Sequence, residues 1–254
     1  MLLRMRKASI IVIGSEILRG LVQDTNSWWL AGKLTEMGFS VIRIIAVPDD
    51  EGEIAWALKS SLEVADVVVV TGGLGFTKDD ITLSAAAKAL GLRLVLSEDA
   101  VEMLKRKVKG EEVQYYIKAA HIPEGGKPLY NQVGISPGVY LEINGKDLFF
   151  LPGVPAEMTK MFEDRVKPLL EGRSRGYMAR ITITTDYTKE SEVDSLVAQL
   201  REKHSDVYFK THATVPVVLS VLVSSSSQKD LQVKLDRIIE ELKKVIKIRD
   251  IKAE

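Results

Sequence analysis

The sequence predicts an α/β fold, in which a mostly parallel sheet is covered by helices on both faces, followed by a small α+β domain. The first observation is that short, β-branched apolar runs alternate with segments of helical periodicity from residue 8 to about residue 172. The second is that the order changes to strand, helix, strand, strand, helix near the C-terminus. The polar segment 173–176 separates the two patterns, so the predicted domains are residues 1–174 and 175–254.

Composition narrows the class of protein. The chain has 254 residues, of which 46% are hydrophobic, and this is enough for two cores. Its formal net charge is zero, which argues against nucleic acid or an acidic membrane as a partner. There is no cysteine, so disulfides and thiolate metal sites are excluded, and the three histidines are too widely spaced for a zinc site. No apolar run approaches the length of a membrane span, so we expect a cytoplasmic protein.

The first predicted strand, residues 10–13, is a continuous apolar run. A helix follows, and Asp24 or Thr25 is expected to cap its start. Glu16 and Asn26 should therefore lie at the carboxyl edge of this strand, beside a pocket. A solvated loop charge explains Glu16 equally well.

The second predicted strand, residues 41–47, is followed by Asp49 and Asp50 and then by a helix with apolar residues at helical spacing. A carboxylate directly after a strand lies where open α/β sheets bind ligands, and this applies to Asp49. Asp50 is expected to cap the helix.

The third predicted strand, residues 67–70, runs into a glycine-rich turn and then into a helix from Ile81. A strand, a glycine turn and a helix N-terminus together form a ready anion site. Asp79 and Asp80 would repel a bare phosphate, unless a divalent metal lies between them and the ligand. One aspartate is expected to be a helix cap, with Asp79 the better candidate, although a plain turn with a cap would explain the segment too. The candidate phosphate-binding residues in this turn are Thr71, Gly72, Gly73, Gly75 and Thr77.

Beyond the turn, residues 98–120 are expected to form one or two helices. Residues 139–143 and 148–151, separated by Asn144-Gly145, predict a β-hairpin. The second domain is predicted to contain strands at 181–184, 207–210 and 217–223, with helices around residues 193–200 and 231–245.

Four segments resemble one known family. They are Gly14-Ser-Glu-Ile-Leu-Arg-Gly20 with Asn26, Thr71-Gly-Gly-Leu-Gly75 with Asp80, Asn131-Gln-Val-Gly-Ile-Ser-Pro-Gly138, and Leu151-Pro-Gly-Val-Pro-Ala-Glu-Met158. Together these segments are similar to the molybdenum-cofactor-biosynthesis domain (MoaB/Mog-like). They are most similar to its CinA-like branch (competence/damage-inducible protein A). The resemblance spans residues 8–172 well and the remainder weakly. Gln132 replaces a proline of the family pattern and Ser136 an alanine.

The resemblance implies a molybdopterin-binding-domain-like fold and extends the candidate ligand site to Glu16, Asn26, Ser136, Gly138, Pro152 and Gly153. CinA-like proteins often carry a further deamidase domain, and the chain ends before it, so deamidation is not expected. Relatives commonly self-associate, so at least a homodimer is expected. The Trp28-Trp29 pair supports this, because a helix buries only one of two adjacent tryptophans well.

The leading hypothesis is a metal-dependent hydrolase of a nucleotide pyrophosphate such as ADP-ribose, which the resemblance implies. Asp49 and Asp80 would hold a divalent metal such as Mg²⁺, and the glycines of the turn would hold the phosphates. One alternative is a protein that binds or adenylylates molybdopterin. Another is a non-catalytic nucleotide-binding module. In each case the expected partner is a phosphate-bearing small molecule, either a nucleotide or a pterin.

Overall fold

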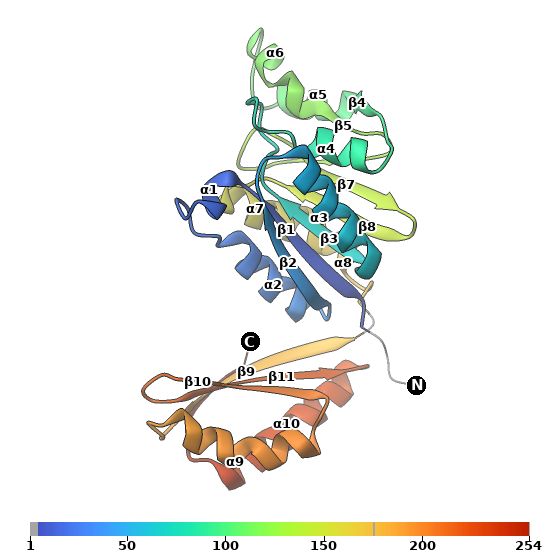
Figure 1. The fold of residues 1–254 in the computed structure, drawn as a ribbon. Coiled ribbons are helices and arrows are strands. Elements are labelled where there is room, and N and C mark those ends of the chain that lie inside the picture. The colour runs from blue at the N-terminus through green and yellow to red at the C-terminus, as the bar shows by residue number, and fades with distance from the viewer. Residues whose placement is uncertain (1–4, 175, 254) are drawn as a thin grey trace. The chain divides into compact units, whose positions relative to one another are not determined.

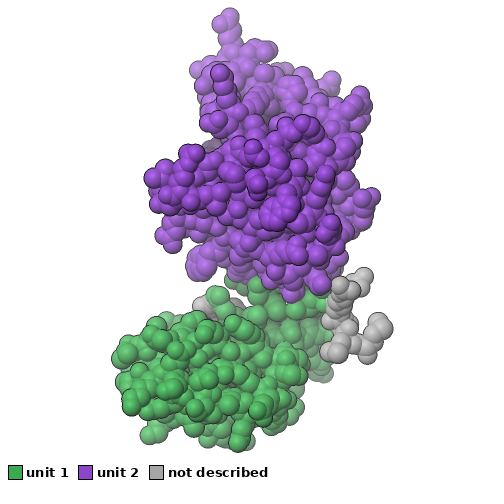
Figure 2. Space-filling view, in the orientation of Figure 1, with its two compact units in different colours: residues 1–5, 35–39, 174–254 green, residues 6–34, 40–173 purple. Residues whose placement is uncertain are grey.

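The computed structural model describes residues 5–174 and 176–253. These residues form two compact units, coloured separately in Figure 2. The larger one, called here the large unit, comprises residues 6–34 and 40–173. The other, the small unit, comprises the described residues of 1–5, 35–39 and 174–254.

The large unit is built on one six-stranded sheet (Figure 1). The four strands from β2 to β8 run parallel, and β7 and β8 pair antiparallel, as do β6 and β7. This confirms the predicted mostly parallel sheet. The order across the sheet is β2 (Ser40–Val47), β1 (Lys7–Ile13), β3 (Val67–Thr71), β8 (Lys146–Leu151), β7 (Gly138–Ile143) and β6 (Lys127–Leu129).

Successive residues of a strand point to opposite faces of the sheet, so the apolar strands present side chains to be buried on both faces. Helices cover both faces. Ile11 and Ile13 of β1 share a buried core with α3 (Glu51–Val64) and α4 (Thr82–Ala89). On the other face, α2 (Asn26–Glu36) packs with the segment formed by α7 (Pro155–Met161), η2 (Phe162–Val166) and α8 (Lys167–Leu170).

The two adjacent tryptophans of α2 differ in burial, as expected. Trp29 packs edge-on against Phe162 of η2, with ring centroids 5.3 Å apart. Trp28 is 77% exposed. The self-association inferred from this pair stays a prediction. Within the described ranges, no helix combines the length and apolar character needed to cross a membrane.

Local sequence signals account for several boundaries in the large unit. The Asp50 carboxylate accepts hydrogen bonds from the N–H groups of Gly52 and Glu53, so Asp50 caps α3 as predicted. The predicted hairpin is β7–β8, and its turn places Asn144 at φ 51° and Gly145 at φ 73°. The segment between α4 and β6 contains β4 (Leu94–Leu96), α5 (Glu98–Lys105), α6 (Glu112–Tyr116), η1 (Ile117–Ala120) and β5 (His121–Pro123).

The small unit is an antiparallel sheet packed with two helices. Its strand order is β10, β11, β9, β12. The elements are β9 (Tyr177–Thr185), α9 (Glu190–Lys203), β10 (Val207–His212), β11 (Val218–Ser225), α10 (Gln228–Val245) and β12 (Ile248–Ala253). The strand β12 was not predicted, because charged residues occupy three of its six positions and hide the alternation.

A partly buried ion cluster in the small unit makes its stability dependent on pH. Glu241 of α10 accepts hydrogen bonds from His204 at 2.8 Å and from Lys203 at 2.9 Å. These bonds hold the pKa of the Glu241 carboxyl at about 2, below its ordinary value of 4.5. The stability that this carboxylate contributes is therefore complete above pH 4.5 and is lost as the pH falls towards 2.

Glu241→Gln should lower the melting temperature of the small unit at neutral pH, and its difference from wild type should shrink steadily in acid. Circular-dichroism melts across an acid titration measure both quantities. Glu240→Gln is the matched control, since Glu240 pairs with Lys243 at the exposed surface, where ion pairs contribute little. A difference between Glu241→Gln and wild type that stays constant down to the acid end would contradict this account.

Candidate functional site

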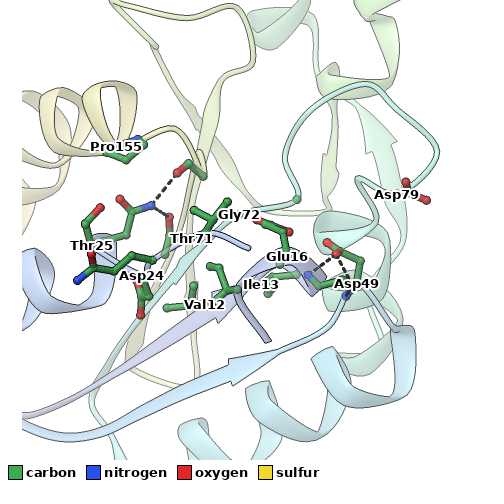
Figure 3. A pocket seen from close by; sticks show the side chains of 18 of the residues that line it. Val12, Ile13, Glu16, Asp24, Thr25, Asp49, Thr71, Gly72, Asp79 and Pro155 are labelled. Atoms are coloured by element: carbon green, nitrogen blue, oxygen red, sulfur yellow. Dashed lines mark hydrogen bonds between the residues drawn. The ribbon is translucent and has the colours of Figure 1, made fainter. Parts of the chain in front are cut away.

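A pocket with a volume of about 560 Å³ opens at the carboxyl ends of β1 and β3 (Figure 3). The chain leaves β1 for β2 on one side and later returns to β3 on the other side of β1. The connecting helices α2 and α3 lie on opposite faces, so the loops diverge here and leave a crevice. The lining residues outside the two strands come chiefly from segments 14–26 and 72–80, with Asp49, Gly153 and Pro155.

The glycine turn after β3 fits the floor of the pocket only because it lacks side chains. Gly72 has φ 106° and Gly73 has φ 66°, both in the region that disfavours other residues. A Cβ atom on Gly72 would lie 2.0 Å from the carbonyl oxygen of Ile13 at the end of β1. The Thr82 hydroxyl donates a hydrogen bond to the Gly72 carbonyl at 2.9 Å, which fixes the turn against the start of α4.

Asn26 joins three elements at the rim of the pocket. Its Nδ2 donates to the Thr71 hydroxyl at 3.0 Å and to the Gly153 carbonyl at 2.8 Å. The Thr71 hydroxyl in turn donates to the carbonyl of Pro152 at 2.8 Å. These bonds connect the start of α2 with the ends of β3 and β8. Asn26, Thr71 and Gly153 line the pocket, as the sequence predicts, whereas Pro152 is not among the described lining residues.

Asp49 lies in the lining and organises the loop after β1. Its Oδ2 accepts hydrogen bonds from the backbone N–H and the hydroxyl of Ser15, both at 2.9 Å. Ser15 begins the short helix α1 (Ser15–Leu18). Next to it, the Glu16 carboxylate folds over Gly14, where a Cβ atom would lie 2.5 Å from Oε1. Figure 3 shows Glu16 and Asp49 on one side of the pocket and Asp24 on the other.

Neither Asp79 nor Asp80 caps the helix α4. Asp79 does not cap α4, because the helix begins only at Thr82 and has no side-chain cap. The prediction of a cap at Asp79 is therefore wrong. Asp80 instead closes the preceding loop: its Oδ1 accepts from the Gly75 N–H at 2.8 Å, and its Oδ2 accepts from the N–H and hydroxyl of Thr77 at 2.8 and 2.6 Å. Both aspartates line the pocket.

The tip of this loop contacts the segment between α4 and β6 that contains α6. The Phe76 ring packs against Tyr115 and Tyr116 of α6, at centroid distances of 5.0 and 4.5 Å. Lys118 donates a hydrogen bond to the carbonyl of Thr77. Gly75 and Thr77, predicted to bind phosphate, are therefore absent from the described lining, and their polar groups are used to close the loop.

Ser136 and Gly138 also lie outside the described lining. Asn131 binds this segment internally, since its Nδ2 donates to the Ser136 carbonyl at 2.9 Å and to Glu157 Oε2 at 2.7 Å. A Cβ atom on Gly138 would lie 2.4 Å from the sulfur of Met161, so close packing of β7 against α7 explains the glycine. The contacts of this segment are therefore with the rest of the large unit, and a role of Ser136 and Gly138 in binding a ligand stays a prediction.

The lining is acidic. Among the described residues it contains five carboxylate side chains, Glu16, Asp24, Asp49, Asp79 and Asp80, and one guanidinium, that of Arg19. No cluster of three or more potential ligands is positioned to hold a metal ion among the described residues. The oxygen donors fit Mg²⁺, because that ion typically uses one or two carboxylates and completes its shell with water and ligand phosphates.

Several lining residues were missed in the sequence, namely Ser15, Arg19, Val22 and Gln23. They all lie between Gly14 and Asn26. Because Glu16 and Asn26 were both expected beside the pocket, the segment joining them had to pass along its edge. The positions of Glu16 and Asn26 could therefore have predicted that the residues between them line the pocket.

Comparison with known proteins identifies the family of the chain. A family model described as the probable molybdopterin binding domain matches residues 9–172. The chain belongs to this family. A protein of Pyrobaculum aerophilum is 36% identical over 95% of this chain and 95% of its own length. A second, from Caldivirga maquilingensis, is 38% identical over 93% of this chain and 95% of its own length.

Among solved structures, the chain is similar to the protein CinA of unknown function from Thermoplasma acidophilum. The two are 40% identical with a TM-score of 0.61, over 65% of this chain and 98% of that one. This supports the CinA-like resemblance seen in the motifs. All lining residues of the pocket fall inside the segment that matches the probable molybdopterin binding domain.

Proposed function

We propose that the pocket binds a nucleotide pyrophosphate such as ADP-ribose together with a divalent cation and hydrolyses it. The observation that carries this proposal is the charge of the lining, with five carboxylates and one guanidinium around a glycine turn suited to phosphate. Such a lining would repel an anionic ligand that arrived alone. A cation shared between the carboxylates and the phosphates removes this repulsion.

Each part of the site has a role in this reaction. The turn at Gly72 and Gly73 lines the pocket next to the start of α4, where backbone N–H groups would hold a phosphate. Asp49 and Asp80 would hold the cation, directly or through water. When bound, Mg²⁺ would neutralise phosphoryl charge and lower the pKa of an attacking water. Asn26 positions the rim by connecting α2 with the ends of β3 and β8.

A second candidate is molybdopterin binding or adenylylation, favoured by the family description itself. The same turn would hold the pterin phosphate. Thermal-shift measurements with ADP-ribose and with molybdopterin, each with and without Mg²⁺, separate the two candidates. Stabilisation by molybdopterin alone would favour the second candidate. Stabilisation by a nucleotide without turnover would favour a non-catalytic binding module.

Asp49→Asn should reduce metal-dependent hydrolysis of ADP-ribose by about 100-fold or more, because metal stabilisation of phosphoryl charge is worth several kcal/mol. Asparagine keeps the size of the side chain and an oxygen that can accept from Ser15, so the melting temperature should change little. The assay compares Mg²⁺, Mn²⁺ and Co²⁺.

The matched control is Asp50→Asn, one residue away and outside the described lining, where asparagine still caps α3. It should retain activity. Full activity in Asp49→Asn would remove the metal assignment. Asp80→Asn is a less clean test, because its carboxylate accepts three hydrogen bonds within its own loop. A loss of activity in Asp80→Asn would combine the loss of a metal ligand with the loss of hydrogen bonds that close the loop.

A further inference from the structure

We infer that Arg19 binds a second phosphate of the ligand, so that the site selects diphosphates over monophosphates. The inference rests on the proposed function and narrows its substrate class. Arg19 lies between α1 and α2 and carries the one guanidinium of the described lining. The family motif that this segment resembles leaves the position of Arg19 open, so the resemblance does not imply this role.

The Arg19 side chain has no hydrogen-bond or ion-pair partner within the described part of the chain, although acidic residues line the same pocket. The two acidic neighbours in sequence are directed elsewhere. Asp24 accepts from the backbone N–H of Ser27 at 2.9 Å and also from its hydroxyl. The Glu16 carboxylate lies over Gly14. The Arg19 side chain is exposed and lines the pocket, so its guanidinium is available to a ligand.

The lining then offers phosphate two kinds of group. Asp49 and Asp80 provide only acceptors and require a cation to approach phosphate. Arg19 provides a planar set of donors that matches the oxygens of a phosphate without any metal. A ligand with two linked phosphates can use both kinds of group at once. A monophosphate uses one.

Isothermal titration calorimetry in Mg²⁺ tests this with two probes, methylenediphosphonate and methylphosphonate, neither of which can be hydrolysed as a pyrophosphate. Arg19→Gln should weaken binding of the diphosphonate by about tenfold or more, the usual effect of losing one charge-assisted contact. It should leave methylphosphonate binding unchanged. The melting temperature of the variant should equal that of wild type, because the replaced side chain has no partner within the described residues.

Arg106→Gln is the matched control: it removes an exposed arginine far from the lining in sequence, at the end of α5, and should affect neither probe. Equal losses for both probes in Arg19→Gln would overturn the inference, as would no loss for either. Wild-type protein that binds neither probe would overturn it too. Arg19-dependent diphosphonate binding without hydrolysis of any nucleotide pyrophosphate would instead refute the proposed function alone.

Discussion

Gly72→Ala should destabilise the large unit by about 3 kcal/mol or more and abolish ligand binding, as two costs add. Holding alanine at a positive φ costs about 1–2 kcal/mol. The new methyl group would also lie 2.0 Å from the Ile13 carbonyl oxygen, which is backbone and cannot rotate away. Relieving such overpacking typically costs another 1–3 kcal/mol. Urea unfolding followed by fluorescence gives the first quantity, and thermal shift with ligand gives the second.

Gly91→Ala separates the two costs. Gly91 has φ 69°, but a Cβ atom there would meet nothing within 4 Å. Its loss should be only about 1 kcal/mol, the backbone cost alone, with ligand binding retained. If Gly72→Ala were no worse than Gly91→Ala, the turn would be able to move away from β1. The geometry assigned to the pocket floor would then be wrong.

Asp147→Asn should cost about 3 kcal/mol, the lower end of the range for breaking a buried ion pair. Asp147 is 2% exposed and binds Arg6 at 3.0 Å and Arg173 at 2.5 Å. The Tyr140 hydroxyl donates to it at 2.9 Å. Burial, together with the hydrogen bond to Asp147, raises the pKa of Tyr140 above its ordinary value of 10. Arg173 is 39% exposed, and water will offset part of its loss.

The comparison is Glu124→Gln, which removes an exposed carboxylate paired with Arg93. Exposed pairs contribute at most about 1 kcal/mol, so this variant should unfold nearly as wild type does. Chemical denaturation of both variants provides the measurement. A loss in Asp147→Asn as small as that in Glu124→Gln would show that Arg6 and Arg173 find water or other partners. Both arginines lie near the ends of the large-unit chain, before β1 and after α8.

The sheet was predictable because its central strands are unambiguous. Val67–Thr71 is fully buried on both faces, and such strands appear in sequence as continuous β-branched runs. The edge of the other sheet was not predictable. In β12 the charged residues Arg249, Asp250 and Lys252 conceal the alternation, and only pairing with β9 makes the segment a strand.

The site was predictable where position along a strand decides the outcome. Asp49, Gly72 and Gly73 follow strands of a parallel sheet, so they had to meet at one edge. Hydrogen-bond partners could not be read in this way. Whether Asp79 or Asp80 capped α4 depended on where the helix began, and a start at Thr82 left Asp80 to bind the loop instead. Ser136 looked ligand-facing in the motif, but Asn131 directs its segment to α7.

The position of β8 between β3 and β7 has a consequence for synthesis of the chain. Before residues 146–151 have left the ribosome, β3 has an open edge on the side that β8 will occupy. The Gly153 carbonyl that Asn26 binds is made later still. A nascent chain therefore completes the rim of its pocket only after most of the large unit has emerged. Ligand affinity measured on stalled chains of increasing length should rise abruptly once Gly153 has cleared the exit tunnel.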